Sequence, residues 1–328
     1  MSFERSAPAL ARTASGRPEK GCSGLAGLAP LGIALQIELG EGIDPAVIGR
    51  ACRGWQGVAE QGGPVMRLRV RLLPDLTGST EPDIVVDGRT LRLSGEGARG
   101  SAEVETMTAH CAVSAAYCRD PERLRENVLD ALVLFVLAHR DRTPIHAAGF
   151  IAGDLAILAG GPSGAGKSSL ALAADARDWP VLSDDTVYFQ ALPQPKIWGI
   201  ARAAHLLLAG SPDPAERIRT RNGKQKRVVG FRANPPRTLC AERAALCVLA
   251  FGPRAALAPI SREEALRRLG PPEPGFDLFI AESRRAHASL TANGAWLLTL
   301  SADPAEAIEV LAANLDRLKA TAMQARAT

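Results

Sequence analysis

Apolar and polar positions alternate along the first third of the chain, which is typical of strands with one buried face. The clearest case is residues 65–72, where apolar residues alternate with arginines. Asp87-Gly88 stands between two short apolar runs and is a strong signal for a two-residue hairpin. Further strands are predicted at residues 31–39 and 103–117, and a short helix at residues 44–55. These segments predict a small, mostly antiparallel sheet.

A helix is predicted after this sheet. Asp120-Pro121-Glu122 combines a capping acid, a proline in the first turn and a second acid that the helix dipole favours. Apolar residues then continue at helical spacing to about Arg140, where we place a domain boundary. The predicted organisation is a disordered tail at residues 1–30, a small α+β N-terminal domain at 31–140 and a larger domain at 141–328.

The larger domain alternates short apolar strands with helices. Residues 155–159 form an apolar strand, and a helix is predicted directly after the loop that follows it. Other strands are predicted at residues 145–151, 179–182, 187–189 and 245–251, with late helices beginning at Ser261 and Asp303. This pattern predicts an α/β (α+β) fold.

Composition and charge agree with a cytoplasmic globular protein. Hydrophobic residues make up 46% of the chain, and the net charge of +4 over 328 residues gives no overall argument for a nucleic-acid partner. The six cysteines contain no Cys-x-x-Cys pair, which favours reduced, buried thiols. Residues 1–24 lack the apolar run of a secretory signal, and the longest apolar run, residues 131–138, is too short to span a bilayer. We therefore expect no membrane partner.

Residues 161–168 read Gly-Pro-Ser-Gly-Ala-Gly-Lys-Ser and match the phosphate-binding pattern Gly-x4-Gly-Lys-Ser. In such loops the backbone N–H groups turn toward the phosphates and the helix N-terminus adds its positive dipole end. The pattern predicts that Lys167 reaches the β- and γ-phosphates of ATP and that the Ser168 hydroxyl ligates Mg²⁺. The predicted nucleotide-binding residues are Gly161, Pro162, Ser163, Gly164, Ala165, Gly166, Lys167, Ser168 and Ser169. A plain glycine-rich turn would not explain Lys-Ser at the helix start.

Asp184 and Asp185 end a predicted strand only 17 residues after Lys167. A short helix followed at once by a strand would bring both acids beside the phosphates. Because adjacent residues of an extended segment point opposite ways, one acid can face the metal and the other the acceptor hydroxyl. His146 lies on the strand expected to pair back toward the loop. On spacing alone, a lone histidine among apolar residues is more often a core residue than a catalyst.

The segment around these residues resembles the catalytic domain of HPr serine kinase and its relatives and, more distantly, phosphoenolpyruvate carboxykinase (ATP). The resemblance covers residues 143–190. It implies a P-loop kinase core, ATP and Mg²⁺ as cofactors, catalytic roles for His146, Lys167 and Asp185, and metal-side roles for Ser168 and Asp184. It also implies that the chain can assemble into homo-oligomers. Some relatives of this group phosphorylate a serine of ribosomally made peptides such as lasso peptides.

Three departures from the family pattern change this expectation. Ser169 stands where HPr kinases usually have glutamate, and Lys196-Ile197-Trp198-Gly199 stands where they have the metal-binding Glu-x-Arg-Gly. Lysine cannot ligate Mg²⁺, and the later catalytic arginine of the family has no counterpart. The function hypotheses are therefore a serine kinase acting on a protein or peptide, a metabolite kinase or carboxykinase-like enzyme, and a non-catalytic nucleotide-dependent module.

A basic segment surrounds Asn222-Gly223. It contains Arg217, Arg219, Arg221, Lys224, Lys226 and Arg227. One interpretation is a solvated hairpin tip; the other is a mobile loop that closes over ATP or holds an acidic substrate. Nucleic acid fits less well, because no aromatic residues interleave these charges.

Overall fold

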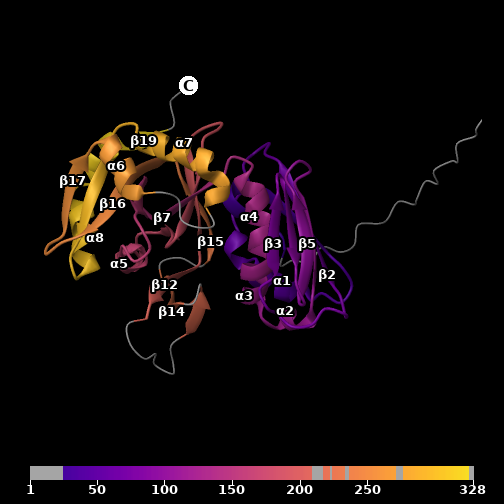
Figure 1. The fold of residues 1–328 in the computed structure, drawn as a ribbon. Coiled ribbons are helices and arrows are strands. Elements are labelled where there is room, and N and C mark those ends of the chain that lie inside the picture. Colours follow the sequence, from indigo (N-terminus) through magenta and orange to yellow (C-terminus); the bar gives the residue numbers. More distant parts are fainter. Residues whose placement is uncertain (1–24, 209–216, 222–223, 233–235, 271–275, 325–328) are drawn as a thin grey trace, which may run out of the picture.

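The computed structural model describes residues 25–208, 217–221, 224–232, 236–270 and 276–324. It shows a mixed α/β fold in which three sheets are found among the described residues. Figure 1 shows an N-terminal half, built around one sheet, beside a C-terminal half that carries the other two. The glycine loop (residues 161–168) belongs to the C-terminal half.

The N-terminal sheet has six strands and mixed directions. β1 and β2 run parallel, as do β2 and β6, whereas β6-β5, β5-β4 and β4-β3 are antiparallel. The prediction of a mostly antiparallel sheet is therefore correct for only part of it. The Asp87-Gly88 hairpin is confirmed between β3 and β4. In sheet order the strands are β1 (Ala34–Leu39), β2 (Val65–Leu72), β6 (Thr108–Val113), β5 (Ala98–Glu103), β4 (Thr90–Ser94) and β3 (Asp83–Asp87).

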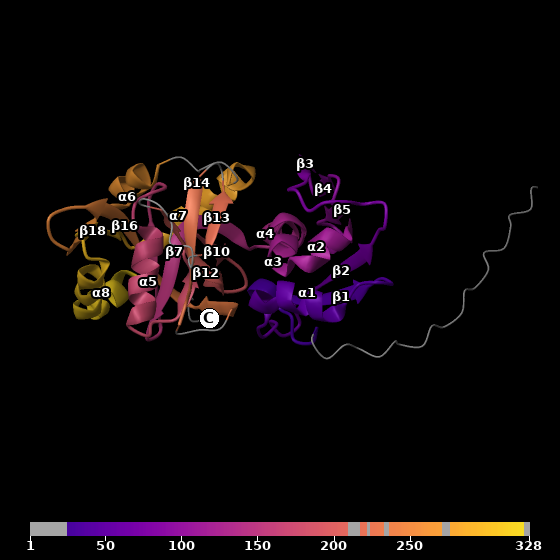
Figure 2. The ribbon, with the colours of Figure 1, turned by 90° about the horizontal axis from the view of Figure 1, so that it is seen from below.

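Helices cover one face of this sheet. The alternation in β2 buries Met66, Leu68 and Val70 and leaves the intervening arginines exposed. The buried side chains pack against α1 (Pro45–Ala51), α2 (Ala115–Arg119), α3 (Pro121–Leu124) and α4 (Asp130–Ala138). Figures 1 and 2 show α3 and α4 between the sheet and the C-terminal half, so the arginine face points away from that half.

The predicted helix after Asp120 is interrupted. The Asp120 carboxylate accepts a hydrogen bond from the Arg123 backbone N at 3.1 Å, which confirms the predicted cap. Between α3 and α4, however, Arg125–Leu129 form a π-helical turn. Helical spacing of apolar residues does not distinguish this wider turn from a continuous α-helix, so the sequence gives no sign of the break.

The C-terminal half is organised around a ten-stranded sheet whose central strand β8 (Leu155–Gly160) is buried on both faces. In β8, Ile157 and Ala159 pack with α5 (Lys167–Ala176) and α8 (Pro304–Ala313), while Ala156 and Leu158 pack with α7 (Ile280–Leu290). A strand covered on both faces is apolar throughout, as this one is. The main path of the sheet is β15 (Arg237–Ala241), β11 (Lys196–Ala201), β10 (Thr186–Gln190), β7 (Thr143–Ala152), β8 (Leu155–Gly160), β16 (Arg243–Phe251), β18 (Ala295–Leu300) and β17 (Ala256–Ile260).

Smaller elements complete this half. β9 (Val181–Ser183) pairs with β7, and β19 (Met323–Gln324) pairs with β16. A three-stranded sheet has the order β12 (Ala203–Leu207), β14 (Lys224–Gly230) and β13 (Ile218–Arg221). The remaining helices are α6 (Arg262–Leu269) and α9 (Leu315–Thr321). Ser261 and Asp303 accept hydrogen bonds from the first turns of α6 and α8, as their predicted capping roles require.

The two halves share apolar packing. Residues 30–32 form a 3₁₀ turn, which corrects the predicted start of the first strand at residue 31. Gly32, at φ 77°, lies against Trp198 of β11 so closely that a Cβ atom would come within 2.3 Å of the indole ring. Tyr188 and Trp198 belong to the same buried cluster as the N-terminal helices. Side chains from beyond residue 140 therefore help to form the core of the N-terminal half.

Glu60 joins the halves through charge. Its carboxylate lies 2.7 Å from Arg142 Nη2 and 2.9 Å from Lys196 Nζ, and Arg142 is buried. Burial raises the pKa of Glu60, but the hydrogen bond from Lys196 and the charge of Arg142 outweigh it and hold the pKa below the ordinary 4.5. The carboxylate therefore stabilises the fold above pH 4.5, and this contribution is lost as the pH falls below that value through the folded pKa.

Replacing Glu60 by glutamine should lower the free energy of unfolding by about 2 kcal/mol at pH 7, because Arg142 loses its charged partner in a buried position. The difference from wild type should shrink as the pH falls below about 4.5. Urea unfolding of both proteins at pH 7 and pH 4 measures this. An equal difference at both pH values would contradict the assigned role of the charge.

The cysteines and the lengths of the helices can be compared with the sequence-based expectations in the described part of the chain. Five cysteines lie there, and all of them are free thiols. Burial raises the pKa of Cys111 and Cys247 to about 12. Within the described ranges, no helix is long and apolar enough to cross a bilayer.

Candidate functional site

The glycine loop joins β8 to α5, at the edge where the parallel strands β8, β16 and β18 end. Ligands of α/β sheets bind at this edge. Gly164 and Gly166 have φ values of 88° and 95°, in the left-handed region that favours glycine. A Cβ atom on Gly166 would also come within 2.7 Å of Leu300. Pro162, Ser163 and Gly164 are exposed, so the loop presents its backbone to solvent at the N-terminus of a ten-residue helix.

Lys167 is buried at the base of the loop. Its Nζ donates to the carbonyl oxygens of Gly161 at 2.7 Å and Pro162 at 3.0 Å. The ammonium group is therefore held inside the curve of the loop, close to the region where a phosphate would meet the backbone N–H groups. To bind a phosphate oxygen, Nζ would exchange these carbonyl partners for the ligand.

Ser168 and Asp184 contact each other directly. Ser168 Oγ donates to Asp184 Oδ2 at 3.0 Å, and the backbone N of His205 donates to the same oxygen at 2.9 Å. Asp184 is 7% exposed. In P-loop nucleotide-binding proteins, a loop serine and an aspartate at a strand end together hold Mg²⁺. The Ser168 hydroxyl and the Asp184 carboxylate thus place oxygen atoms next to each other at the start of α5.

Two glycines allow the strand before Asp184 to take its place. β9 pairs with β7, with Gly149 opposite Ser183. A Cβ on Gly149 would come within 2.8 Å of Val187, and a Cβ on Gly199 of β11 would come within 2.4 Å of the Leu182 carbonyl oxygen. Only a residue without a side chain permits these approaches. Gly149 and Gly199 therefore help to set the position of Asp184 relative to the loop.

Asp185 faces a different partner from Asp184. Its Oδ1 lies 3.2 Å from His146 Nε2. The contact follows from the pairing of β10 with β7, in which Thr186 is opposite His146. The Asp185 side chain is 42% exposed, and the His146 ring stacks on Phe276 at a centroid distance of 5.3 Å. The histidine is therefore oriented from two sides, and part of the Asp185 side chain is exposed.

The structure thus brings the predicted site residues together in two pairs. Ser168 with Asp184 forms one, and His146 with Asp185 forms the other, while Lys167 lies within the loop itself. Ser169 follows in the first turn of α5 and is half-buried. The two adjacent acids do contact different partners, but they lie in the bend between β9 and β10 and not on an extended strand, because the backbone N atoms of Asp185 and Thr186 both donate to Ser183 Oγ.

His205 is a residue that the sequence did not single out. It lies on β12, and its ring Nδ1 is 3.7 Å from Asp184 Oδ2 in addition to the backbone hydrogen bond. The adjacent Arg202 makes a bidentate pair with Asp130 of α4 at 2.6 and 2.7 Å. That pair ties the start of β12 to the N-terminal half. A backbone N–H donor carries no sequence signal, which is why spacing alone does not reveal this contact.

The basic segment lies partly outside the described residues. Its flanks form β13 and β14, which supports the hairpin interpretation, but residues 222–223 are not described. Arg217 pairs with Glu122, and Arg219 pairs with both Glu122 and Glu126. In this structure these two arginines therefore contact the N-terminal half rather than the glycine loop.

The segment in place of the family's Glu-x-Arg-Gly has a structural role. Lys196 pairs with Glu60, and Trp198 Nε1 donates to Gln190 Oε1 at 2.6 Å. Both side chains lie at the junction of the halves, and neither supplies an oxygen to the Ser168–Asp184 pair. Within the described residues, no group of three or more His, Cys, Asp or Glu side chains is placed to hold a metal ion.

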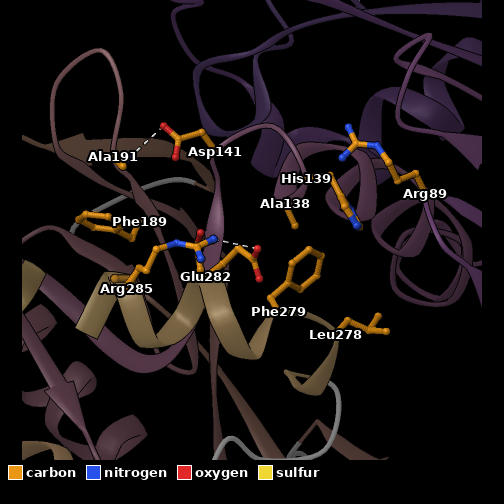
Figure 3. Close-up of a pocket in the computed structure, with 12 residues that line it drawn as sticks. Arg89, Ala138, His139, Asp141, Phe189, Ala191, Leu278, Phe279, Glu282 and Arg285 are labelled. Atoms are coloured by element: carbon orange, nitrogen blue, oxygen red, sulfur yellow. Dashed lines mark hydrogen bonds and ion pairs between the residues drawn. The ribbon is translucent and has the colours of Figure 1, made fainter. Parts of the chain in front are cut away.

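A cavity of about 280 Å³ lies at this junction, apart from the glycine loop. Figure 3 shows His139 and Arg89 on one side of it, with Phe279 and the Glu282–Arg285 pair of α7 on the other. His139 Nδ1 lies 2.9 Å from the Phe135 carbonyl oxygen, and its ring meets Phe279 edge-on. No predicted site residue lines this cavity, so it is not the candidate active site.

Comparison with known proteins gives little further information. No protein-family model matches the chain, and no curated protein matches it. Among solved structures, the chain is similar to the HPr(Ser) kinase/phosphatase from Coxiella burnetii, with 15% sequence identity and a TM-score of 0.25. The match covers 54% of this chain and 97% of that chain. A similarity this weak does not identify the family or the activity of this chain.

Proposed function

We propose that this chain is an ATP- and Mg²⁺-dependent phosphotransferase that phosphorylates a serine hydroxyl of a protein or peptide. The observation that supports the proposal is that Asp184 accepts a hydrogen bond from Ser168 of the glycine loop, while the next residue, Asp185, has its carboxylate 3.2 Å from His146 Nε2. Phosphoryl transfer needs an anion on the metal side and a carboxylate that orients the attacking hydroxyl. A module that binds a nucleotide but catalyses no reaction would need only the anion on the metal side.

The residues present fit an Mg²⁺–ATP complex. The Ser168 hydroxyl and the Asp184 carboxylate are hard oxygen donors, and Mg²⁺ in nucleotide sites is usually held by one or two protein oxygens together with phosphates and water. When bound, the ion would neutralise charge on the β- and γ-phosphates. Lys167 would add a second positive charge at the same phosphates, and the backbone N–H groups of the loop would hold their oxygens.

In the proposed reaction Asp185 acts as the base. Its carboxylate accepts the proton of the serine hydroxyl while the serine oxygen forms a bond to the γ-phosphorus. The bond between that phosphorus and the β–γ bridging oxygen breaks, and ADP leaves with the electron pair. His146 holds the Asp185 carboxylate in position through the 3.2 Å contact. It is therefore a positioning residue in this scheme.

The exposure of Asp185 favours a polypeptide acceptor. A metabolite kinase typically encloses a small acceptor in a pocket, whereas the Asp185 side chain is 42% exposed. Incubation with ATP labelled in the γ-phosphate, Mg²⁺ and a panel of serine-containing peptides and proteins tests the proposal. Transfer to serine supports it. Transfer only to small hydroxyl compounds would favour the metabolite kinase or carboxykinase-like alternative, and ATP binding without any transfer would favour the regulatory module.

The proposed metal pair predicts a specific defect for Ser168→Ala. Loss of the hydroxyl removes one ligand and the hydrogen bond that orients Asp184, so the Mg²⁺ concentration giving half-maximal activity should rise by about tenfold or more. Ser289→Ala, an exposed position on α7, is the matched control and should titrate like wild type. Identical Mg²⁺ titration curves for Ser168→Ala and Ser289→Ala would remove Ser168 from the metal site.

A further inference from the structure

The outer face of the six-stranded sheet carries a broad groove of about 920 Å³ that phosphotransfer at the glycine loop does not use. The groove lies over β2, β6, β5 and β4, on the side away from the helices. Its basic lining residues are Arg69, Arg71, Arg92, Arg99 and His110, and no acidic residue lines it. We propose that this groove, the basic groove, binds an acidic segment of a partner polypeptide.

The strand register places the four arginines in two neighbouring rows on the same face of the sheet. Arg69 is opposite His110 across β2 and β6, and Arg92 stands in the same row on β4. Arg71 and Arg99 stand in the next row on either side of Ala112. With about 4.8 Å between strands and about 3.3 Å per residue along them, the Cα positions outline a patch of roughly 14 by 7 Å. An extended segment of about four residues covers that length.

Three of these guanidinium groups have no ion-pair partner in the described part of the chain. Arg69 pairs with Glu38 at 2.6 Å, but among the described residues Arg71, Arg92 and Arg99 form no ion pair. Exposed arginines without carboxylates are available for bidentate binding of carboxylate or phosphate groups. The other acids on this face are Asp83 and Asp87 on the edge strand β3, and Glu103, which accepts a hydrogen bond from Thr90.

The remaining lining favours a polypeptide over a nucleic acid. Ala112 lies between Arg71 and Arg99, Val85 and Leu73 add aliphatic surface at the margins, and no Phe, Tyr or Trp side chain lines the groove. Sheet faces that bind single-stranded nucleic acids stack bases on aromatic rings. Acidic side chains interspersed with aliphatic ones match this surface better. Residues 1–24 of this chain are a poor occupant, because they carry four basic residues and only two acids.

Binding to a defined probe tests the proposal. The probe is a fluorescein-labelled peptide of about twenty residues containing glutamate, leucine and alanine, measured by fluorescence anisotropy with the full chain at low salt. Wild type should bind, and Arg92→Glu/Arg99→Glu should bind roughly tenfold or more weakly, because two attractive charges become repulsive. Rising salt should weaken wild-type binding. Arg92→Gln/Arg99→Gln should fall between them.

The control is Arg262→Glu/Arg284→Glu, which changes the net charge equally at exposed positions on α6 and α7. It should bind the peptide like wild type. Equal peptide affinity of Arg92→Glu/Arg99→Glu and this control would overturn the proposal, as would absence of binding by wild type. Tighter binding of labelled oligothymidylate at the same arginines would assign the groove to nucleic acid instead. If wild type sediments as a dimer and Arg92→Glu/Arg99→Glu sediments as a monomer, the groove binds a second copy of this chain instead. Thermal unfolding checks that each variant folds.

Discussion

Asp185→Asn should lower the rate of phosphotransfer by about 10²- to 10⁴-fold while leaving ATP binding close to wild type. The amide can still contact His146, so the local packing changes little, but it cannot accept the proton of an attacking hydroxyl. In the proposed site, ATP and Mg²⁺ would be held by the glycine loop and the Ser168–Asp184 pair, and the substitution leaves the hydrogen bond of that pair in place. Initial rates of γ-phosphate transfer, together with titration calorimetry of ATP, separate the two effects.

Asp303→Asn is the matched control for this change. Asp303 caps α8 by accepting a hydrogen bond from the Ala305 backbone N at 2.9 Å, and asparagine caps helices equally well. It should leave transfer and ATP binding unchanged. A full rate of transfer in Asp185→Asn, in an assay where Asp303→Asn is also fully active, would rule out Asp185 as the base. Loss of ATP binding in Asp185→Asn would show instead that the residue supports the nucleotide site.

Gly199→Ala should lower both the free energy of unfolding and the rate of phosphotransfer, although the residue lies on β11 and not in the glycine loop. Its added methyl would lie 2.4 Å from the Leu182 carbonyl oxygen and 2.6 Å from the Leu182 carbonyl carbon, so β9 must shift. The clash involves backbone atoms, and we expect a destabilisation of about 3 kcal/mol. Because Asp184 and Asp185 directly follow β9, a shift of about 1 Å should also reduce phosphotransfer by roughly 10²-fold.

Gly230→Ala provides the comparison for Gly199→Ala. Gly230 ends β14, and a Cβ there would meet nothing within 4 Å. Urea unfolding should show a large loss of stability for Gly199→Ala and a change of less than about 1 kcal/mol for Gly230→Ala. If both variants unfold and transfer phosphate like wild type, the close contact between β11 and β9 does not control the position of the acids.

The sequence predicted the parts of the candidate site whose residues lie close together along the chain. The glycine loop is contiguous, and its strand and helix neighbours follow directly in the chain. The 17-residue spacing from Lys167 to Asp184 led us to expect a short helix followed at once by a strand, and α5 and β9 have this arrangement, with Asp184 accepting a hydrogen bond from Ser168. The Asp185–His146 contact depends on the register of β10 against β7, and the sequence alone does not give that register.

The parts that the sequence did not predict depend on contacts between distant segments. Alternation of apolar residues is the same in parallel and antiparallel strands, so it could not show that β1, β2 and β6 run in one direction. His205 reaches Asp184 through its backbone N–H group, a donor that every residue except proline possesses. The pairing of Arg219 with Glu122 and Glu126 joins segments about a hundred residues apart, and charge alone does not select such partners.

In the proposed function, the glycine loop and the two acids form one site for Mg²⁺–ATP and an acceptor hydroxyl. A crystal structure with a non-hydrolysable ATP analogue and Mn²⁺, located by its anomalous signal, tests this arrangement. We expect Lys167 Nζ at the phosphates, Mn²⁺ held by the Ser168 hydroxyl and the Asp184 carboxylate, and the Asp185 carboxylate facing the γ-phosphate. Nucleotide bound away from the loop, or an Asp185 side chain turned away from the γ-phosphate, would contradict it.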